Sequence, residues 1–469
     1  METLFDTVNS PELASGVFPS SLAIAVPFWA EGENVIFLPG KVKKLPGWQN
    51  LNVGTISGDV GALAQEFTGS ETRLYIATDS NWYSWDGTTL TGIGSGFGAK
   101  EWSLIPWETW LIGTNNSDVP QVWKNTGTSA ALAGVPFAAA KIFKKLGPHL
   151  LAYNTSNGAN FLEWCSANQP EIWTPAAANS AGNLTLRELD SGVVAVQDLR
   201  GGHAVYSQDT MVFVQWISLN DGFGRRKAIN GVGAIGKHAV VGVHAINYGI
   251  SRRGVWVTDG VTVEYIDYNS RGNAVAKLIQ DELDFALGEE VIGWHDEENF
   301  MVRWEYPTTS GTRRGIGFSY KTGGWSVLPA TGFDFAIEQQ VFNFPLAAKN
   351  RRVFNVNDGK DADGTAMECW VRTKPMGLGD DEKTKIVQAL RVYVDDFTDF
   401  KVRFGTQEEH DDAPTYHTDY AGVATIDLNQ NQQQENRFAV VEFRSTSLDA
   451  DWELNGFKLL GQKDVAYSK

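Results

Sequence analysis

The sequence predicts an all-β protein: a six-bladed β-propeller-like disc followed by a small C-terminal antiparallel β domain. One pattern recurs six times, a short apolar run, a polar turn and an aromatic run that closes on Trp or Tyr. The copies begin at Leu74, Trp110, Leu150, His203, Arg253 and Phe300, between 36 and 53 residues apart. That spacing brackets the about 40–50 residues of one propeller blade. The 48 Gly and 5 Met further indicate a chain rich in turns and poor in helices.

Each copy has the composition of a β-hairpin. Aromatic and β-branched residues flank turn-forming residues such as those at 78–81 and the Asp259-Gly260 pair. A lone hairpin is marginal in water, so the copies must pack their apolar faces on one another. Closing them into a ring also protects the strand edges. The 17 Trp, 25 Phe and 13 Tyr are therefore expected mainly between blades.

The two ends of the chain are expected to lie outside the repeats. Residues 1–20 are polar and form an N-terminal arm, and residues 21–372 form the propeller, starting with a hairpin around Pro39-Gly40 that begins or closes the ring. Residues 373–385 are a charged linker. The alternating strands of residues 386–469 are too few for two more blades and predict a small β-sandwich.

One segment within the repeats has helical periodicity. From Gly272 onward, apolar residues recur at helical spacing, and they are Val275, Leu278, Ile279, Leu283 and Ala286. We expect an amphipathic helix between two blades, packed on the rim of the disc or at a subunit contact.

Charge and cysteine content exclude several classes of function. The formal net charge of −17 disfavours sequence-independent binding to nucleic acid or anionic lipid, which requires clustered cations. Cys165 and Cys369 are too far apart in sequence, and too isolated, to indicate a disulfide framework or a zinc site. The N-terminus has no signal-peptide pattern, and no apolar stretch is long enough to span a membrane, so synthesis in a cytoplasm without membrane insertion is expected.

The motifs that could carry chemistry are weak. GVGAIG, from Gly231, satisfies GxGxxG but precedes a strand rather than a helix, so we interpret its glycines as an inter-blade turn. Residues 359–370 lack the spacing of a calcium loop, and the His-acid runs at 295–298 and 410–412 are expected to diverge. No nucleophile motif is present, so we predict no catalytic, cofactor or metal residues and no enzyme.

The cations of this acidic chain occur as doublets, several of them in predicted loops. Arginine at loop tips suits pairing with carboxylates of another subunit. We take as candidate subunit-interface residues Arg225, Arg226, Arg252, Arg253, Arg313, Arg314, Arg351 and Arg352.

Three stretches resemble a known family. They are NVIFLPGKVKKLPGW from Asn34, NFLEWCSANQPEIWTPAAANSAGNLTL from Asn160 and IGFSYKTGGWSVL from Ile316. They are similar to the tail nozzle proteins of short-tailed phages, also described as packaged-DNA stabilisation or tail accessory proteins. The resemblance implies a virion tail protein that forms a homohexamer below an adaptor ring and above a needle, plug or fibre protein, retains packaged DNA, and conducts it on ejection. Weakly repulsive acidic walls would let the double-stranded DNA pass without specific binding.

Two other functions stay open. A carbohydrate-binding or glycan-hydrolysing propeller would use exposed Trp as sugar platforms or carboxylates gathered from several blades. A peptide-recruiting scaffold propeller is disfavoured because the repeated Gly-His and Trp-Asp signatures are absent.

Overall fold

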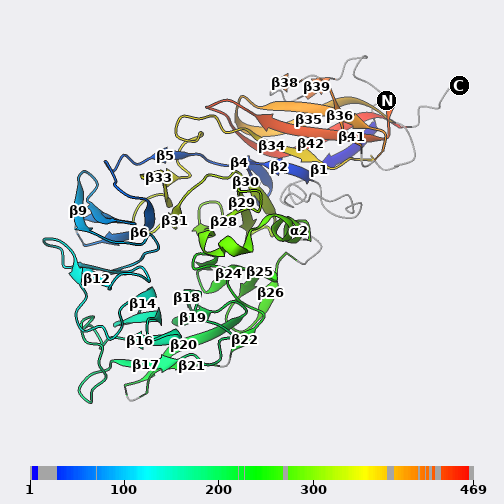
Figure 1. Cartoon of the computed structure of the whole chain (residues 1–469). Helices are drawn as coiled ribbons and strands as arrows, with labels where there is room; N and C mark the ends of the chain where they lie inside the picture. The colour runs from blue at the N-terminus through cyan, green and yellow to red at the C-terminus, as the bar shows by residue number, and fades with distance from the viewer. Residues whose placement is uncertain are drawn as a thin grey trace.

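The chain forms a ring of small sheets with a β-sandwich beside it (Figure 1). This computed structural model describes residues 3–8, 29–69, 71–219, 221–226, 228–267, 273–377, 385–409, 412–417, 419–421, 425–427 and 435–463. The all-β prediction is confirmed, and the ring is a β-propeller.

Seven four-stranded antiparallel units make up the ring in the described part of the chain. The first three blades are β6 (Val60–Phe67), β7 (Thr72–Thr78), β8 (Asn81–Trp85) and β9 (Leu90–Ser95); β10 (Ser103–Trp107), β11 (Trp110–Thr114), β12 (Gln121–Trp123) and β13 (Ala130–Ala131); and β14 (Ala140–Leu146), β15 (His149–Thr155), β16 (Gly158–Trp164) and β17 (Gly182–Thr185). The fourth and fifth are β18 (Ala195–Leu199), β19 (Gly202–Tyr206), β20 (Thr210–Ser218) and β21 (Gly222–Arg225), with β22 (Ile229–Asn230) added on β20; and β23 (Val240–Val243), β24 (Ile246–Ser251), β25 (Gly254–Thr258) and β26 (Val263–Tyr265). The last two are β27 (Ile292–Asp296), β28 (Met301–Pro307), β29 (Arg313–Ser319) and β30 (Trp325–Leu328); and β31 (Phe335–Ile337), β32 (Leu346–Lys349), β33 (Arg352–Val356) and β5 (Trp48–Asn50).

The sequence predicted six blades, and this count is wrong because the ring has seven. Each of the six sequence copies lies in a different blade, and the seventh blade carries no copy of the pattern. Its outer strand β5 comes from the N-terminal part of the chain and pairs with β33, so this blade is completed across about 300 residues of sequence. The N-terminal part of the chain therefore closes the ring, but the Pro39-Gly40 hairpin that was expected to do so lies in the sandwich. The closing strand follows the Pro39-Gly40 hairpin instead of being part of it.

Aromatic side chains fill the spaces between blades, as expected. Fourteen of the 17 Trp side chains are buried, and the other three, Trp110, Trp216 and Trp370, are half-buried. Trp304 shows the typical arrangement. It lies in blade six, is fully buried, and donates from its indole nitrogen to the carbonyl of Ala239 beside blade five at 3.1 Å.

The glycines of the GVGAIG segment serve inter-blade packing, as interpreted from the sequence. Gly231 has a φ of +82°, which favours glycine. A Cβ on Gly233 would lie 1.9 Å from the carbonyl oxygen of Gln208, and one on Gly236 would lie 2.0 Å from that of Gly288. The backbones of adjoining blades approach too closely here for any side chain, and strand β23 follows.

The predicted helix lies between blades five and six. It is α2 (Asn273–Glu282), followed by the 3-10 helix η1 (Phe285–Glu290). Val275, Ile279 and Leu283 are buried in the same cluster as Trp304, and α2 contacts β25. The apolar stripe therefore packs on the ring.

The sandwich combines both ends of the chain in two sheets. The first sheet contains β1 (Thr3–Val8), β3 (Val35–Leu38), β4 (Lys41–Lys44), β35 (Lys385–Thr398), β39 (Thr425–Asp427), β40 (Glu435–Asn436) and β42 (Asp451–Lys463). The second contains β2 (Trp29–Glu33), β34 (Cys369–Thr373), β36 (Lys401–Gln407), β37 (Thr415–Tyr416), β38 (Tyr420–Ala421) and β41 (Phe438–Ser445). One apolar core, with Trp29, Phe443 and Trp452 among its members, joins the two sheets.

These pairings correct the expected domain limits. Residues 29–44 and β34 were assigned to the propeller at 21–372 but belong to the sandwich, because their strands pair with β42 and β41. Part of the expected arm at 1–20 is strand β1, which pairs with β42. Residues 9–28 and 378–384, which include most of the arm and most of the linker at 373–385, lie outside the described residues.

The sandwich packs on blade six. The backbone N–H of Asn34 donates to the carbonyl of Val327 at 3.3 Å, and the Thr322 hydroxyl donates to the carbonyl of Phe37 at 3.3 Å. Ile36 and Leu328 lie in one buried apolar cluster at the same junction. Apolar burial together with these hydrogen bonds fixes the sandwich against the ring.

Candidate functional site

The four predicted arginine doublets lie on one face of the ring. Within a blade the second and third strands are joined on the face where the links between blades also run. Arg252 and Arg253 lie in the β24–β25 turn, Arg313 and Arg314 begin β29 after the loop from β28, Arg351 and Arg352 lie at the β32–β33 turn, and Arg225 and Arg226 end β21. The doublets therefore occupy consecutive blades four to seven of this face, which we call the arginine face.

Most of these arginines contact carboxylates of their own chain. The pairs, with nitrogen–oxygen distances, are Arg225–Glu188 at 2.6 Å, Arg253–Asp209 at 2.6 Å, Arg313–Glu305 at 2.8 Å, Arg351–Asp59 at 3.3 Å, Arg352–Asp363 at 3.7 Å, and Arg314–Glu282. Arg226 lies over the ring of Phe213, and Arg252 is exposed. The structure thus places all eight candidates together on a face of mixed charge. Whether this face meets another subunit stays a prediction.

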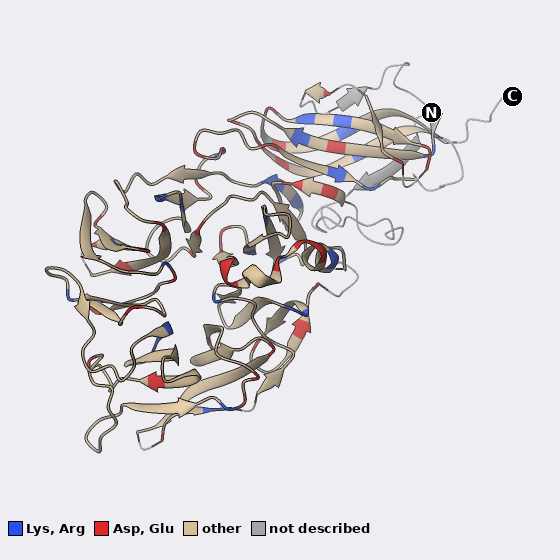
Figure 2. Cartoon of the chain, viewed as in Figure 1, with Lys and Arg blue, Asp and Glu red and all other residues tan. Residues whose placement is uncertain are grey.

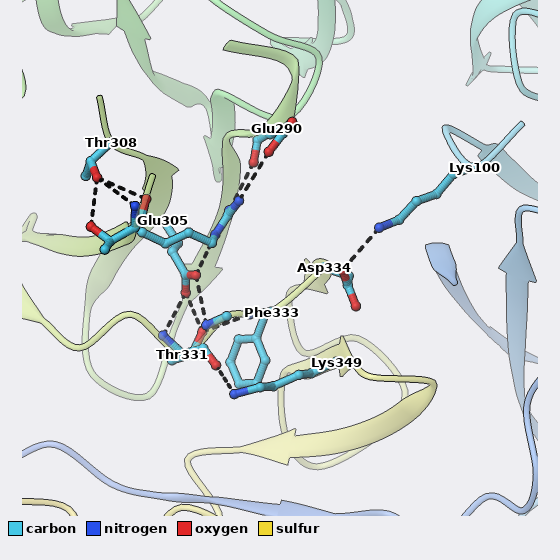
Figure 3. A network of polar contacts seen from close by, with 11 residues as sticks. Lys100, Glu290, Glu305, Thr308, Thr331, Phe333, Asp334 and Lys349 are labelled. Atoms are coloured by element: carbon cyan, nitrogen blue, oxygen red, sulfur yellow. Dashed lines mark hydrogen bonds and ion pairs between the residues drawn. The ribbon is translucent and has the colours of Figure 1, made fainter. Parts of the chain in front are cut away.

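Glu305 organises the part of the arginine face shown in Figure 3. Its carboxylate is 1% exposed and accepts from Arg313 Nε, from the Thr331 backbone N–H at 3.0 Å and from the Gly332 N–H at 2.9 Å. Beside it, Lys100 pairs with Asp334 at 3.1 Å (Figure 3). These contacts fix the link between blades six and seven.

Side chains that cross the ring close its centre at the arginine face. Lys237, just before β23 of blade five, donates from Nζ to the carbonyl of Trp102, just before β10 of blade two, at 2.7 Å. Lys141 in β14 of blade three pairs with Glu289, just before blade six, at 2.6 Å. Burial lowers the pKa of the Lys237 ammonium to about 8. No sequence signal indicated these contacts, because their partners are 135 and 148 residues apart.

The centre of the ring forms a polar cup toward the opposite face. This cavity has a volume of about 510 Å³. Its polar lining includes Asp198, His244, His295, Glu297 and Glu338. The inner strands of the ring end here, which brings together side chains from several blades.

Polar contacts of His295 line the mouth of the cup. His295 Nε2 and the Tyr320 hydroxyl are 3.1 Å apart, and His295 Nδ1 lies 3.6 Å from Glu338. Burial, with the nearby Glu297 carboxylate, raises the pKa of Tyr320 to about 12. The Asp198 side chain is 74% exposed. Its partial desolvation acts to raise its pKa, but the hydrogen bond from His203 and the charge of Lys144 outweigh this effect and lower the pKa.

The residues that resembled ion sites serve the fold. Asp361 accepts from the backbone N–H of Gly364 at 2.5 Å, which closes a turn. His295 and Asp296 diverge as expected, because Asp296 turns to the buried Arg303. Among the described residues, no group of three or more His, Cys, Asp or Glu is arranged to hold a metal ion. The run at 410–412 begins with two residues outside the described ones.

The cysteines and tryptophans are packing residues. Burial raises the pKa of the Cys165 thiol to about 11, and Cys369 is also buried and free. The three half-buried Trp side chains are covered: Lys124 lies over Trp110, His149 stacks on Trp216, and Arg372 lies over Trp370. None of the 17 Trp side chains, all of which the structure describes, is as exposed as the sugar platforms of the carbohydrate hypothesis would be.

Asp267 supports the turn that carries Arg252 and Arg253, and it makes this part of the ring sensitive to pH. Its side chain is fully buried and accepts from the Val255 N–H at 2.7 Å, while its other oxygen has no partner among the described residues. Burial raises the pKa of Asp267 from 3.8 to about 6. The folded protein thus binds the proton of the Asp267 carboxyl more tightly than the unfolded chain does. Ionisation of this carboxyl therefore lowers the stability of the fold.

We therefore expect the contribution of Asp267 to stability to be present below about pH 4 and lost as the pH rises to about 6. In Asp267→Asn this loss should disappear, so that the variant gains about 1–2 kcal/mol relative to the parent between pH 4 and pH 7, after solvent screening is allowed for. Urea unfolding at both pH values measures the change. If the free energies of unfolding of the parent and of Asp267→Asn differ by the same amount at pH 4 and at pH 7, the raised pKa of Asp267 is contradicted.

Comparisons with known proteins add little to this geometry. No family model matches the sequence, and no curated protein matches it. Solved structures that are similar include BBS1N in complex with ARL6DN soaked with lead, at 12% identity and a TM-score of 0.42 over 68% of this chain and 99% of that one. The mercury-soaked form of that complex gives 13% identity and 0.41 over 66% and 96%, and a glycoside hydrolase gives 10% and 0.25 over 88% and 100%. These likenesses carry no argument about function.

No helix among the described residues is long and apolar enough to cross a membrane.

Proposed function

We propose that this protein is a structural subunit of a phage tail, a nozzle protein whose six copies form a tube that retains packaged DNA and conducts it outward. The observation that carries the proposal is the arginine face, where doublets from four consecutive blades gather on one side of the ring. Arginine that already contacts a carboxylate can bind a second one through its remaining donors, because the guanidinium has five N–H groups.

The centre of the ring is closed, and this determines where DNA would pass in the proposed assembly. Lys237 and Lys141 cross it at the arginine face. A double helix, whose major groove alone is about 12 Å wide, does not fit through such a ring. The conduit in this proposal therefore lies between copies, and the rings form its wall. A chain charge of −17 makes that wall weakly repulsive to phosphate, which favours sliding over binding.

Each copy in a closed ring of six shows two different surfaces to its neighbours. The propeller and the sandwich, fixed to one another at blade six, offer such a pair of surfaces. An adaptor ring above and a needle, plug or fibre protein below would complete the assembly, in the virion after synthesis in the host cytoplasm.

The mass of the assembled protein tests the proposal. We expect six times the mass of one chain by mass photometry, and at least tenfold weaker assembly for Arg252→Glu combined with Arg351→Glu. Arg200→Glu is the matched control, because Arg200 pairs with Asp259 on the opposite face. Such a subunit can stay monomeric until it meets the preceding ring, so tail particles isolated from phage are measured as well. A copy number other than six in those particles would contradict the proposal. So would a double variant, Arg252→Glu with Arg351→Glu, that assembles as well as the Arg200→Glu control.

A carbohydrate-binding propeller remains the second candidate, favoured by the polar cup with Asp198, Glu297 and Glu338 in its lining. Carboxylates and amides on several blades can bind sugar hydroxyls. Binding of the monomer to a glycan array, abolished by Asp198→Asn, would support this candidate over the nozzle.

A further inference from the structure

The solvent faces of the two sandwich sheets differ in how their charges are paired. In the second sheet, opposite charges alternate across neighbouring strands: Arg372 is the register partner of Glu442, and Glu442 is the register partner of Arg403. Glu31 pairs with Arg372 at one end of this row, and Asp419 pairs with Arg403 at the other. Opposite charges in such positions stabilise a sheet.

The like-charged register pair in the second sheet is compensated. Lys401 lies opposite Arg444. Lys401 pairs with Asp399 at 3.6 Å, and Arg444 pairs with Glu368 at 2.6 Å. The second sheet therefore neutralises its own cations.

The first sheet pairs Lys41 and Lys43 with Glu453, but it leaves other cations of its solvent face without such a partner. Arg391 of β35 lies directly opposite Lys458 of β42. The residues adjacent to Arg391 and Lys458 in sequence, such as Leu390 and Leu459, belong to the sandwich core, so Arg391 and Lys458 both face solvent. Among the described residues, neither has a carboxylate within 4.0 Å. Figure 2 shows Lys and Arg as blue bands on the strands of the sandwich.

An exposed aromatic ring completes this surface, which we call the cationic patch and define as Arg391, Tyr393 and Lys458. Tyr393 is 45% exposed, and Lys458 Nζ lies 5.7 Å from the centre of its ring. Like charges directly opposite each other destabilise a sheet. Tyr and Arg are also the residue types enriched in interfaces. An acidic partner would therefore both remove the repulsion and bury the aromatic ring.

We infer that the cationic patch binds a carboxylate-rich surface of a second copy of this chain. The inference rests on the proposed assembly and deepens it by naming one side of the subunit contact. Charge complementarity supports it, because copies of net charge −17 repel one another unless a local cationic surface meets an acidic one. The contact is head-to-tail, since the patch and its acidic counterpart are different surfaces of the chain.

A zero-length carbodiimide cross-link tests the contact directly, because it joins an amine to a carboxylate only where the two touch. Equal amounts of ¹⁴N-labelled and ¹⁵N-labelled protein are mixed at low salt and treated. We expect cross-linked peptides that contain Lys458 and carry both isotopes. Cross-links from Lys458 with a single isotope, or none, would overturn the inference.

Charge reversal gives the second measurement. Lys458→Glu should weaken assembly at least tenfold by mass photometry while leaving the unfolding midpoint unchanged or higher, since the new carboxylate faces Arg391. Lys401→Glu is the matched control in the other sheet and should leave assembly unchanged. Assembly that survives Lys458→Glu overturns the inference and leaves the nozzle proposal standing. A parent protein with neither assembly nor mixed-isotope cross-links, in solution and in tail particles alike, contradicts both. If Lys458→Glu loses binding to duplex DNA while its assembly is unchanged, the cationic patch binds a polyanion instead of a second copy, and the inference is overturned.

Discussion

Replacing Asp296 with Ala should lower the free energy of unfolding by about 3–5 kcal/mol, because it leaves a buried arginine without its counter-charge. Asp296 is fully buried and Arg303 is 1% exposed, with Arg303 Nη1 at 3.4 Å from the carboxylate. Asn299 and Asn357 donate to the same carboxylate at 3.0 and 2.8 Å. Burial lowers the pKa of Arg303, against the opposing effect of Asp296, but the guanidinium stays charged.

Urea unfolding followed by tryptophan fluorescence measures this loss. Glu171→Ala is the control, since its ion pair with Lys124 is solvent-exposed and should contribute less than about 1 kcal/mol. Adding Arg303→Met to Asp296→Ala should recover much of the loss, because the uncompensated charge is then gone. If Asp296→Ala costs no more than Glu171→Ala, the buried pair does not stabilise blade six as described.

The second large effect is expected at Trp304. Truncation to Ala removes a fully buried indole between blades five and six and its hydrogen bond to Ala239, at a cost of about 3–5 kcal/mol. Trp304→Phe keeps most of the apolar volume and should cost clearly less. Trp370→Ala, at a half-buried position of the sandwich, serves as the comparison. Chemical denaturation of the three variants ranks them, and equal losses for Trp304→Ala and Trp370→Ala would contradict the central role of inter-blade indoles.

The repeats predicted the propeller because a blade is a local structure. Its second and third strands are joined by a short turn, so their apolar and aromatic residues follow one another in sequence, as at Leu150 and Trp164. The helix after Gly272 was predictable for the same reason, since its buried residues Val275 and Ile279 are one turn apart. The seventh blade was missed because β5 pairs with β33 across the whole ring.

The candidate site was predicted in part. The arginine doublets were visible in the sequence, whereas their gathering on one face follows from the alternation of strand direction around the ring. The carboxylates that pair with them, such as Glu188 and Asp59, lie in links between blades and were not predicted. The cationic patch was missed entirely, because Arg391 and Lys458 are adjacent only through the register of β35 and β42.

The sequence by itself determined the all-β class, the hairpins, the rim helix, the acidic balance and the turn glycines of GVGAIG. Each of these depends on residues close together in the chain, where periodicity and turn chemistry act. The tertiary structure decided the number of blades, the entry of residues 29–44 into the sandwich, the crossing of the ring centre by Lys237 and the pairing of six of the eight doublet arginines. Those features join residues far apart in sequence, and only the packed chain brings their atoms within hydrogen-bonding distance.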